Sequence, residues 1–205
     1  MKEFSELLVI ADRLLGEGGC PWDREQTLFT LQPYLLEETH ELIEAIDREA
    51  PVDMIEELGD VLYTLVFIAK LGEIQGLFSI RDALAGVSEK LIRRHPHVFG
   101  DKKNQSTEDV IETWEAVKKE EKGRKSIMEG IPPTLPVIAR AQKIQQKLKR
   151  VKSPLSLEGQ KHLSEEDVGR NLWKLIADAE ASGVDAESAL RRFCGNIEEE
   201  YTELG

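Results

Sequence analysis

The 205-residue chain is poor in cysteine and in aromatic residues. It holds two cysteines, and aromatic residues make up 6% of the sequence. Because Cys20 and Cys194 form no Cys-x-x-Cys pair, neither a zinc site nor a disulfide framework is indicated. We therefore expect a protein of the reducing cytoplasm.

Long apolar runs are also missing. The longest uncharged one extends from Val61 to Ala69, far short of the roughly 20 residues that a membrane-spanning helix needs. Residues 1–15 carry acidic side chains within their apolar pattern and lack a small-residue cleavage site. We expect neither a signal peptide nor a membrane partner.

Positive charge is scarce over the first three-fifths of the chain. The formal net charge is −12; residues 1–122 hold 26 acidic and 14 basic residues, whereas residues 123–205 hold 13 of each. An acidic surface repels a nucleic-acid backbone, so we expect no nucleic-acid polymer as a partner. Such a chain can still bind a phosphate compound if metal ions lie between them.

Helical periodicity is what the sequence has in abundance, and no segment shows a convincing strand pattern. Leu, Ile, Ala, Glu and Lys are abundant, which favours helix over sheet. We predict an all-α fold. Its helices are expected near residues 3–15, 33–48, 51–75, 79–94, 107–121, 134–150, 164–182 and 185–203.

Glycine and proline gather in residues 123–136, which predicts a linker between two regions. Residues 168–173 then weakly echo residues 58–63, with Arg170 at the position that corresponds to Asp60. We therefore predict a catalytic helical domain at 1–122. Residues 123–205 would form the linker and a degenerate helical half-repeat that has lost the chemistry.

Paired carboxylates stand out in the second and third predicted helices. Glu38 and Glu41 are three residues apart, as are Glu57 and Asp60, and this spacing places each pair on one helix face. The connection between the helices is short, so they should lie antiparallel and adjacent. The sequence therefore predicts that four carboxylates converge.

Converging carboxylates repel one another unless a cation is present. Oxygen ligands without Cys or His favour Mg²⁺, Mn²⁺ or Ca²⁺ over zinc, and such an ion suits reaction at a phosphate chain. A Glu-x-x-His motif at Glu37 and His40 leaves a di-iron bundle as an alternative. No second Glu-x-x-His occurs in the chain, which argues against iron.

The acidic pattern resembles that of the MazG nucleotide pyrophosphohydrolase family. The resemblance covers residues 1–122 and also rests on residues 19–27 (GCPWDREQT), 33–38 (PYLLEE) and 93–100 (RRHPHVFG). It implies a helical bundle of the all-α NTP pyrophosphatase type that forms a homodimer or a larger homo-oligomer. Residues 130–151 look like the start of the second catalytic-type domain of larger family members.

The resemblance also implies a set of site residues. Glu38, Glu41, Glu57 and Asp60 would be the catalytic metal ligands for Mg²⁺, with Mn²⁺ as a substitute. Glu37 and Glu56 would support these ligands or orient water. Basic and aromatic residues on later helices would hold the nucleotide. The expected substrate-binding residues are Trp22, Glu37, Glu56, Lys90, Arg94, Trp114 and Lys118.

The function expected from these observations is Mg²⁺-dependent hydrolysis of a nucleoside triphosphate to a nucleoside monophosphate and diphosphate, with broad or non-canonical base specificity. Two alternatives remain open beside the di-iron protein. One is a related enzyme acting on dUTP or phosphoribosyl-ATP. The other is a catalytically silent helical regulator that binds nucleotides or a protein.

Overall fold

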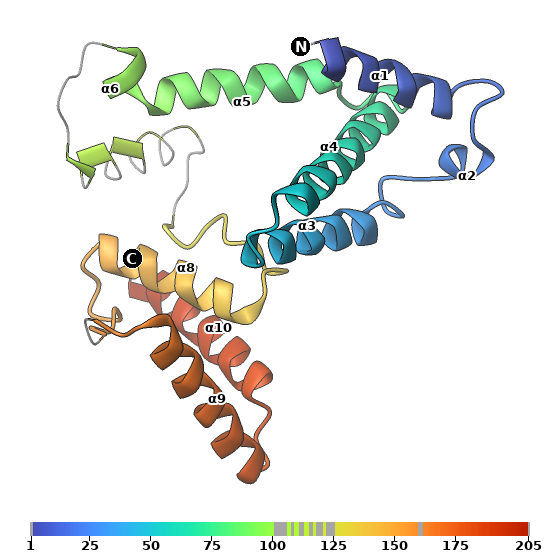
Figure 1. Ribbon diagram of the computed structural model, residues 1–205. Helices are drawn as coiled ribbons and strands as arrows, with labels where there is room; N and C mark the ends of the chain where they lie inside the picture. The colour runs from blue at the N-terminus through green and yellow to red at the C-terminus, as the bar shows by residue number, and fades with distance from the viewer. Residues whose placement is uncertain are drawn as a thin grey trace. The chain divides into compact units, whose positions relative to one another are not determined.

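The protein is all-α in the computed structural model, which confirms the predicted fold class. The model describes residues 2–100, 106, 107, 109, 110, 113, 114, 117, 121, 126–159 and 162–204. The helices of this part of the chain are labelled in Figure 1. They are α1 (Lys2–Leu15), α2 (Pro21–Arg24), α3 (Gln32–Asp47), α4 (Pro51–Ile74), α5 (Ile80–Arg94), α6 (Pro96–Phe99), α8 (Val137–Arg150), α9 (Glu165–Ala181) and α10 (Ala186–Leu204).

The predicted helix ends agree with these bounds to within three residues. The exception is the helix predicted at 107–121, which falls largely outside the described residues. Two short helices, α2 and α6, were not predicted. Each begins at a proline, Pro21 or Pro96, whose fixed φ suits the first turn of a helix.

Two compact units make up the chain, Met1–Val110 and Ile111–Gly205. The predicted domain boundary at 122–123 stays a prediction. None of the helices in the described part of the chain is long and apolar enough to cross a membrane.

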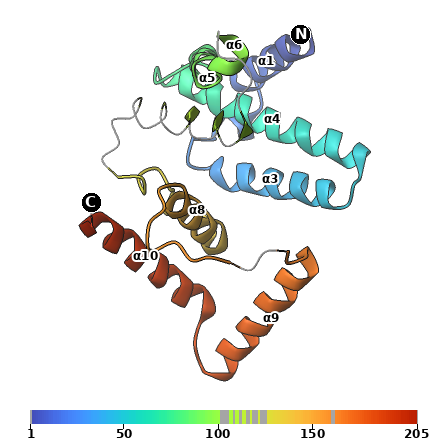
Figure 2. The same cartoon turned by 90° about the vertical axis from the view of Figure 1, so that its left-hand side faces the viewer.

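The α3–α4 hairpin is the central feature of the first unit, and its two helices run antiparallel and side by side (Figures 1 and 2). At the end of α3, the Ala50 N–H donates to Ala45 O at 3.0 Å and the Glu49 N–H to Ile46 O at 2.9 Å. These bonds satisfy the last helical carbonyls in a Schellman motif, which places Glu49 at φ 51°. Pro51 then starts α4 at once, so the hairpin is tight.

The core of the first unit lies against the C-terminal half of α4. Phe67 and Leu71 are buried there together with Leu31, which belongs to the loop before α3. The Lys70 ammonium binds the Asp12 carboxylate at 2.8 Å and thereby ties α4 to α1. Apolar packing and this ion pair hold α1, the loop and the hairpin in one arrangement.

In the second unit, α8 packs on α10 around Ile144, Leu148 and Cys194, with Met128 from the preceding segment. The Lys147 ammonium also donates to the Ile127 carbonyl, which fixes that segment on α8. Helix α9 meets α10 at the turn between them and diverges from it (Figure 2). No residue of α9 is buried.

Replacing Glu49 with glycine should stabilise the fold. A side chain at φ 51° is strained, whereas glycine adopts this conformation freely. The gain from relieved strain exceeds the entropy that glycine loses on folding, so we expect Glu49→Gly to raise the free energy of unfolding by about 0.5–1 kcal/mol. Urea denaturation measures it.

Glu49→Ala is the matched control because it removes the same charge but keeps a Cβ atom. It should leave stability near that of the parent. Equal stabilisation by both variants would show that charge, and not backbone conformation, limits this turn.

Candidate metal centre

Three carboxylates meet between α3 and α4. Glu38 and Glu41 come from α3 and Glu57 from α4, and one side-chain oxygen of each lies within 4.8 Å of the other two. Glu38 and Glu57 are half-buried, whereas Glu41 is exposed. The structure thus brings together three of the four acids that the sequence singled out.

The antiparallel register explains why these acids meet. Glu41 and Glu57 lie within hydrogen-bonding reach of each other, and the charge of Asp60 acts on Glu38 one turn further along. Each helix advances about 5.4 Å per turn, so acids three apart on one helix face acids three apart on the other.

The acids repel one another, and this shows in their proton affinities. Partial burial, followed by the charges of Asp60, Glu41 and Glu37, raises the pKa of Glu38. Partial desolvation also raises the pKa of Glu57, with the charge of Glu41 as the next cause. A raised carboxyl pKa means that the fold favours the neutral form, so a bound cation would relieve this strain.

Asp60, Glu37 and Glu56 surround this three-carboxylate group without joining it. Asp60 is exposed, and its charge raises the pKa of both Glu38 and Glu57. Glu37 and Glu56 are exposed neighbours whose charges act in the same direction. All three therefore add negative potential at the edge of the group.

The other predicted residues lie on other elements. Lys90 and Arg94 belong to α5; Lys90 is half-buried, and Arg94 is only 5% exposed, so its guanidinium is largely inside the protein. Trp114 is half-buried and belongs to the second unit. Lys118 lies outside the described residues. The substrate-binding roles of these residues stay predictions.

Sequence reasoning missed two tyrosines beside the acids. Trp22 contacts Tyr34 edge-to-face, with ring centroids 5.7 Å apart and planes at 80°. Burial, followed by the charges of Asp23 and Cys20, raises the pKa of the Tyr63 hydroxyl. Tyr63 therefore lies near the segment that carries Trp22. Tyr34 precedes Glu38 by four residues, a spacing that could have placed it on the acidic face.

The donor set fits a hard divalent cation. The three converging ligands are all carboxylates, and the part of the chain that the structure describes adds no Cys or His to them. Mg²⁺ and Mn²⁺ prefer such oxygen ligands, whereas zinc and iron sites usually contain imidazole or thiolate. His40 does not join the group, so these contacts do not favour the di-iron alternative.

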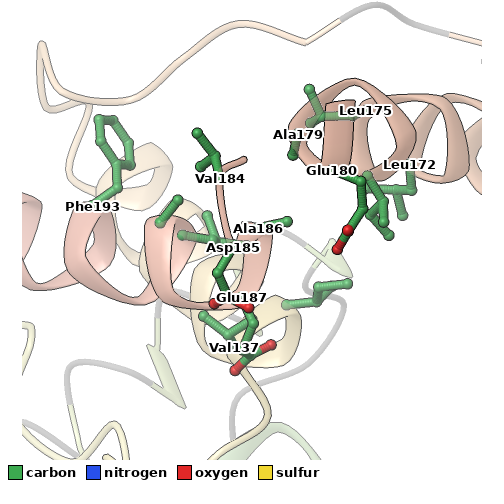
Figure 3. Close-up of a pocket in the computed structure, with 14 residues that line it drawn as sticks. Val137, Leu172, Leu175, Ala179, Glu180, Val184, Asp185, Ala186, Glu187 and Phe193 are labelled. Atoms are coloured by element: carbon green, nitrogen blue, oxygen red, sulfur yellow. The ribbon is translucent and has the colours of Figure 1, made fainter. Parts of the chain in front are cut away.

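A separate pocket of about 700 Å³ lies in the second unit, between α9 and α10, with α8 beside it (Figure 3). Its walls are mainly apolar, including Leu172, Leu175 and Phe193. Three carboxylates, from Glu180, Asp185 and Glu187, also line it. Among the described residues, no basic side chain lines this pocket, so these residues offer no charge partner to a phosphate.

Known proteins are similar to this chain in sequence and in fold. Residues 26–99 match the model of the MazG nucleotide pyrophosphohydrolase domain, a range that includes all four predicted ligands. The chain is 39% identical to "Nucleoside triphosphate pyrophosphohydrolase/pyrophosphatase MazG" of Thermotoga maritima, over 98% of this chain and 85% of that protein. The chain belongs to the MazG family.

Three further comparisons support the assignment. The chain is 45% identical to "Nucleoside triphosphate pyrophosphohydrolase" of Escherichia coli (strain K12) over 74% of its length. The chain spans 59% of the length of that protein. It spans 30% of the length of a relative from Bacillus subtilis (strain 168). The crystal structure of a mazG-related protein from Thermotoga maritima superposes with a TM-score of 0.50 and 30% identity, covering 56% of this chain and 98% of that one.

Removing one carboxylate should have opposite effects with and without metal. In EDTA, Glu57→Gln should raise the melting temperature, because it relieves repulsion from Glu41. The same variant should show a smaller rise in melting temperature on adding Mg²⁺, because a ligand is lost. Differential scanning fluorimetry with EDTA and with MgCl₂ measures both effects.

Glu17→Gln is the control, since Glu17 is an exposed acid in the loop after α1. Its charge is not among those that raise the pKa of Glu38 or Glu57, so removing it should leave both melting temperatures unchanged. A Glu57→Gln protein with the full Mg²⁺ response would argue against a metal site here.

Proposed function

We propose that this protein hydrolyses nucleoside triphosphates to nucleoside monophosphates and diphosphate, with Mg²⁺ as cofactor. The observation that carries the proposal is the meeting of Glu38, Glu41 and Glu57 within 4.8 Å in a MazG-family fold. Relatives that bear the name nucleoside triphosphate pyrophosphohydrolase support the reaction. The predicted cytoplasmic location accords with it and stays a prediction.

The acids supply the metal-binding part of the proposed site. Glu38, Glu41 and Glu57 would hold the ion, and Asp60 would complete the set from its place beside Glu38. Mg²⁺ bound there would neutralise charge on the phosphate chain and lower the pKa of a water. The exposed carboxylates of Glu37 and Glu56 would accept hydrogen bonds from such a water and orient it.

Cations for the diphosphate leaving group must come from other elements. Ammonium and guanidinium groups bind phosphate oxygens well. Of the three predicted cations, Lys90 is the best candidate, because it is partly accessible and lies in the same unit as the acids. Arg94 would have to leave its buried position to contact substrate. Substrate binding by Lys118 and by the Trp114 indole is proposed from the sequence alone.

A homodimer is part of this proposal. Helix α4 exposes Ile55, Leu58, Leu62 and Leu65, which are 74%, 49%, 41% and 46% accessible. Their spacing of three, four and three residues is the heptad pattern by which helices pack on one another. The centre of the stripe lies about 120° around the helix from Glu57, so a second copy could pack on α4 without covering this acid.

The reaction is tested by incubating the protein with a panel of canonical and modified nucleoside triphosphates, with Mg²⁺ or EDTA. We expect release of diphosphate and monophosphate only with Mg²⁺. Glu38→Gln and Asp60→Asn should lower kcat/KM by about 100-fold or more, the scale on which one lost electrostatic group acts. Glu17→Gln should retain full activity.

Other outcomes would contradict the residue assignment or favour one of the alternative functions. Full activity in folded Glu38→Gln and Asp60→Asn proteins would overturn the assignment of these residues. A folded wild-type protein that binds Mg²⁺ but releases no diphosphate would favour the silent regulator. Preferential cleavage of dUTP or phosphoribosyl-ATP would identify the related-enzyme alternative.

The dimer is tested by placing a charge in the α4 stripe. Ile55→Glu should convert a dimer to a monomer in size-exclusion chromatography with light scattering, because burying a carboxylate among apolar side chains is costly. Leu157→Glu, at an exposed apolar position of the second unit, should stay dimeric. A wild-type protein that is monomeric at micromolar concentrations would refute the dimer.

A further inference from the structure

The second unit has an apolar groove between α9 and α10 that plays no part in the proposed reaction. Its volume is about 700 Å³, and its walls come from α9, the first turns of α10 and the start of α8 (Figure 3). The two helices diverge from the turn that joins them (Figure 2). Helix α9 buries none of its 17 residues, so it has a face that is free to pack on a partner.

The free face of α9 is an apolar stripe. Val168, Leu172, Leu175 and Ile176 follow one another at four, three and one residues, a spacing that puts them on one face of the helix. Each of these side chains is between 39% and 64% exposed. Phe193 lines the opposite wall on α10 and is exposed as well. Apolar side chains gathered in this way mark an interaction surface, and their helical spacing suits a helix as the partner.

Acidic side chains form the polar rim of the groove. Glu180 comes from the α9 wall, and Asp185 and Glu187 lie where α10 begins (Figure 3). Asp185 accepts a hydrogen bond from the Ser188 N–H at 2.6 Å and thereby serves the start of α10. Glu180 and Glu187 are exposed, and within the described part of the chain neither forms an ion pair. Two unpaired carboxylates beside apolar walls are complementary to a partner that carries positive charge.

The second unit already holds one helix of this complementary kind. Helix α8 carries five basic residues and no acidic one. It packs on α10 through Ile144 and Leu148, and the Arg140 guanidinium binds the Glu198 carboxylate of α10. A basic amphipathic helix is therefore what α10 accepts on one side. The groove presents the same chemistry, apolar side chains with acids at the edge.

A second copy of α9 is a poorer match to the groove. Helix α9 has Glu165, Glu166 and Asp167 in its first turn, and Glu180 lies near its other end. Parallel packing of two copies would place these acids beside themselves, and antiparallel packing would place Glu180 beside the acids of the first turn. Like charges meet in either orientation, which opposes association. Charge therefore favours a basic partner over self-association.

We propose that the α9–α10 groove binds a basic amphipathic helix of another protein, about three turns long. Apolar side chains of the partner pack on Leu172, Leu175 and Phe193, and its Lys or Arg side chains pair with Glu180 and Glu187. This inference does not depend on the proposed reaction, since all of these residues belong to the second unit. The second unit then contributes binding of a protein partner and no catalysis.

The test measures binding of two synthetic peptides to the full chain. Both peptides are about four helical turns long and carry leucine at helical spacing on one face. One has lysine at the polar positions, and the other has glutamate at the same positions. Fluorescence anisotropy of the labelled peptides gives both dissociation constants at physiological ionic strength. The lysine peptide should bind roughly tenfold more tightly or better, because only its charges complement the rim.

Charge reversal tests the rim. Glu180→Lys together with Glu187→Lys should weaken binding of the lysine peptide roughly tenfold and make the glutamate peptide the tighter ligand. Glu199→Lys together with Glu200→Lys is the matched control. It changes the net charge by the same amount at exposed positions of α10 that do not line the groove. The control should keep the preference for the lysine peptide.

A substitution in the stripe tests the apolar wall. Leu175→Gln should weaken binding of the lysine peptide roughly tenfold, because a leucine side chain is no longer buried by the partner. Leu157→Gln, at an exposed apolar position of the second unit outside the groove, should bind as wild type does. Both side chains are exposed, so we expect both variants to fold, and melting curves by circular dichroism check this.

Several results would overturn the proposal. One is a folded wild-type protein that does not bind the lysine peptide, and another is equal binding of the two peptides. Equal weakening by the Glu199 and Glu200 control would show unspecific attraction between charges. Binding of dodecyltrimethylammonium without binding of the lysine peptide would assign the groove to a small organic cation. If Leu175→Gln reduces the oligomeric state in size-exclusion chromatography with light scattering, a second copy fills the groove and the proposal is wrong.

Discussion

Electrostatic repulsion among the carboxylates between α3 and α4 is the constraint on which the first unit depends. Three acids within 4.8 Å oppose the packing that brings them together. Partial burial, followed by the charges of the neighbouring acids, raises the pKa of Glu38 and of Glu57. The free energy that holds them must come from elsewhere in the fold. A site of this kind is poised to bind a cation, because binding removes a cost that folding has imposed.

The parts of the fold that oppose this repulsion lie at the two ends of the hairpin. At one end, the backbone bonds of Ala50 and Glu49 close the turn within a few residues. Towards the other end, Phe67 and Leu71 pack against Leu31, and Lys70 ties α4 to α1 through Asp12. The acids lie between these two anchors, so their spacing is set by the backbone and not by mutual attraction.

Helical periodicity was sufficient to predict most of the fold and the central acids. The acids on α3 and α4 were predictable because spacing along a helix defines a face, and a short connection defines an antiparallel neighbour. Asp60 shares that face with Glu57, yet it lies outside the tight group. Sequence spacing gives the direction of a side chain but not how far it reaches.

Contacts between distant segments could not be predicted in this way. The Trp22–Tyr34 pair joins a loop to a helix, and its formation depends on how residues 16–31 fold over the hairpin. Burial of Arg94 is a similar case. The four-residue spacing of Lys90 and Arg94 predicts a shared face of α5, but only the packing around α5 decides which of the two is accessible.

Helix α9 shows that a sequence echo of an acidic position does not by itself provide the surroundings of a metal site. Arg170, at the position that echoes Asp60, forms an ion pair with Glu166 one turn earlier in its own helix, and both side chains are exposed. Such a pair contributes only a few tenths of a kcal/mol to a helix. Arg170→Asp would create a solvated charge and no metal site, since α9 buries no residue that could hold it against a second acidic helix. Building a metal site at this position would therefore require several coordinated changes, in the packing of the helix as well as in its acids.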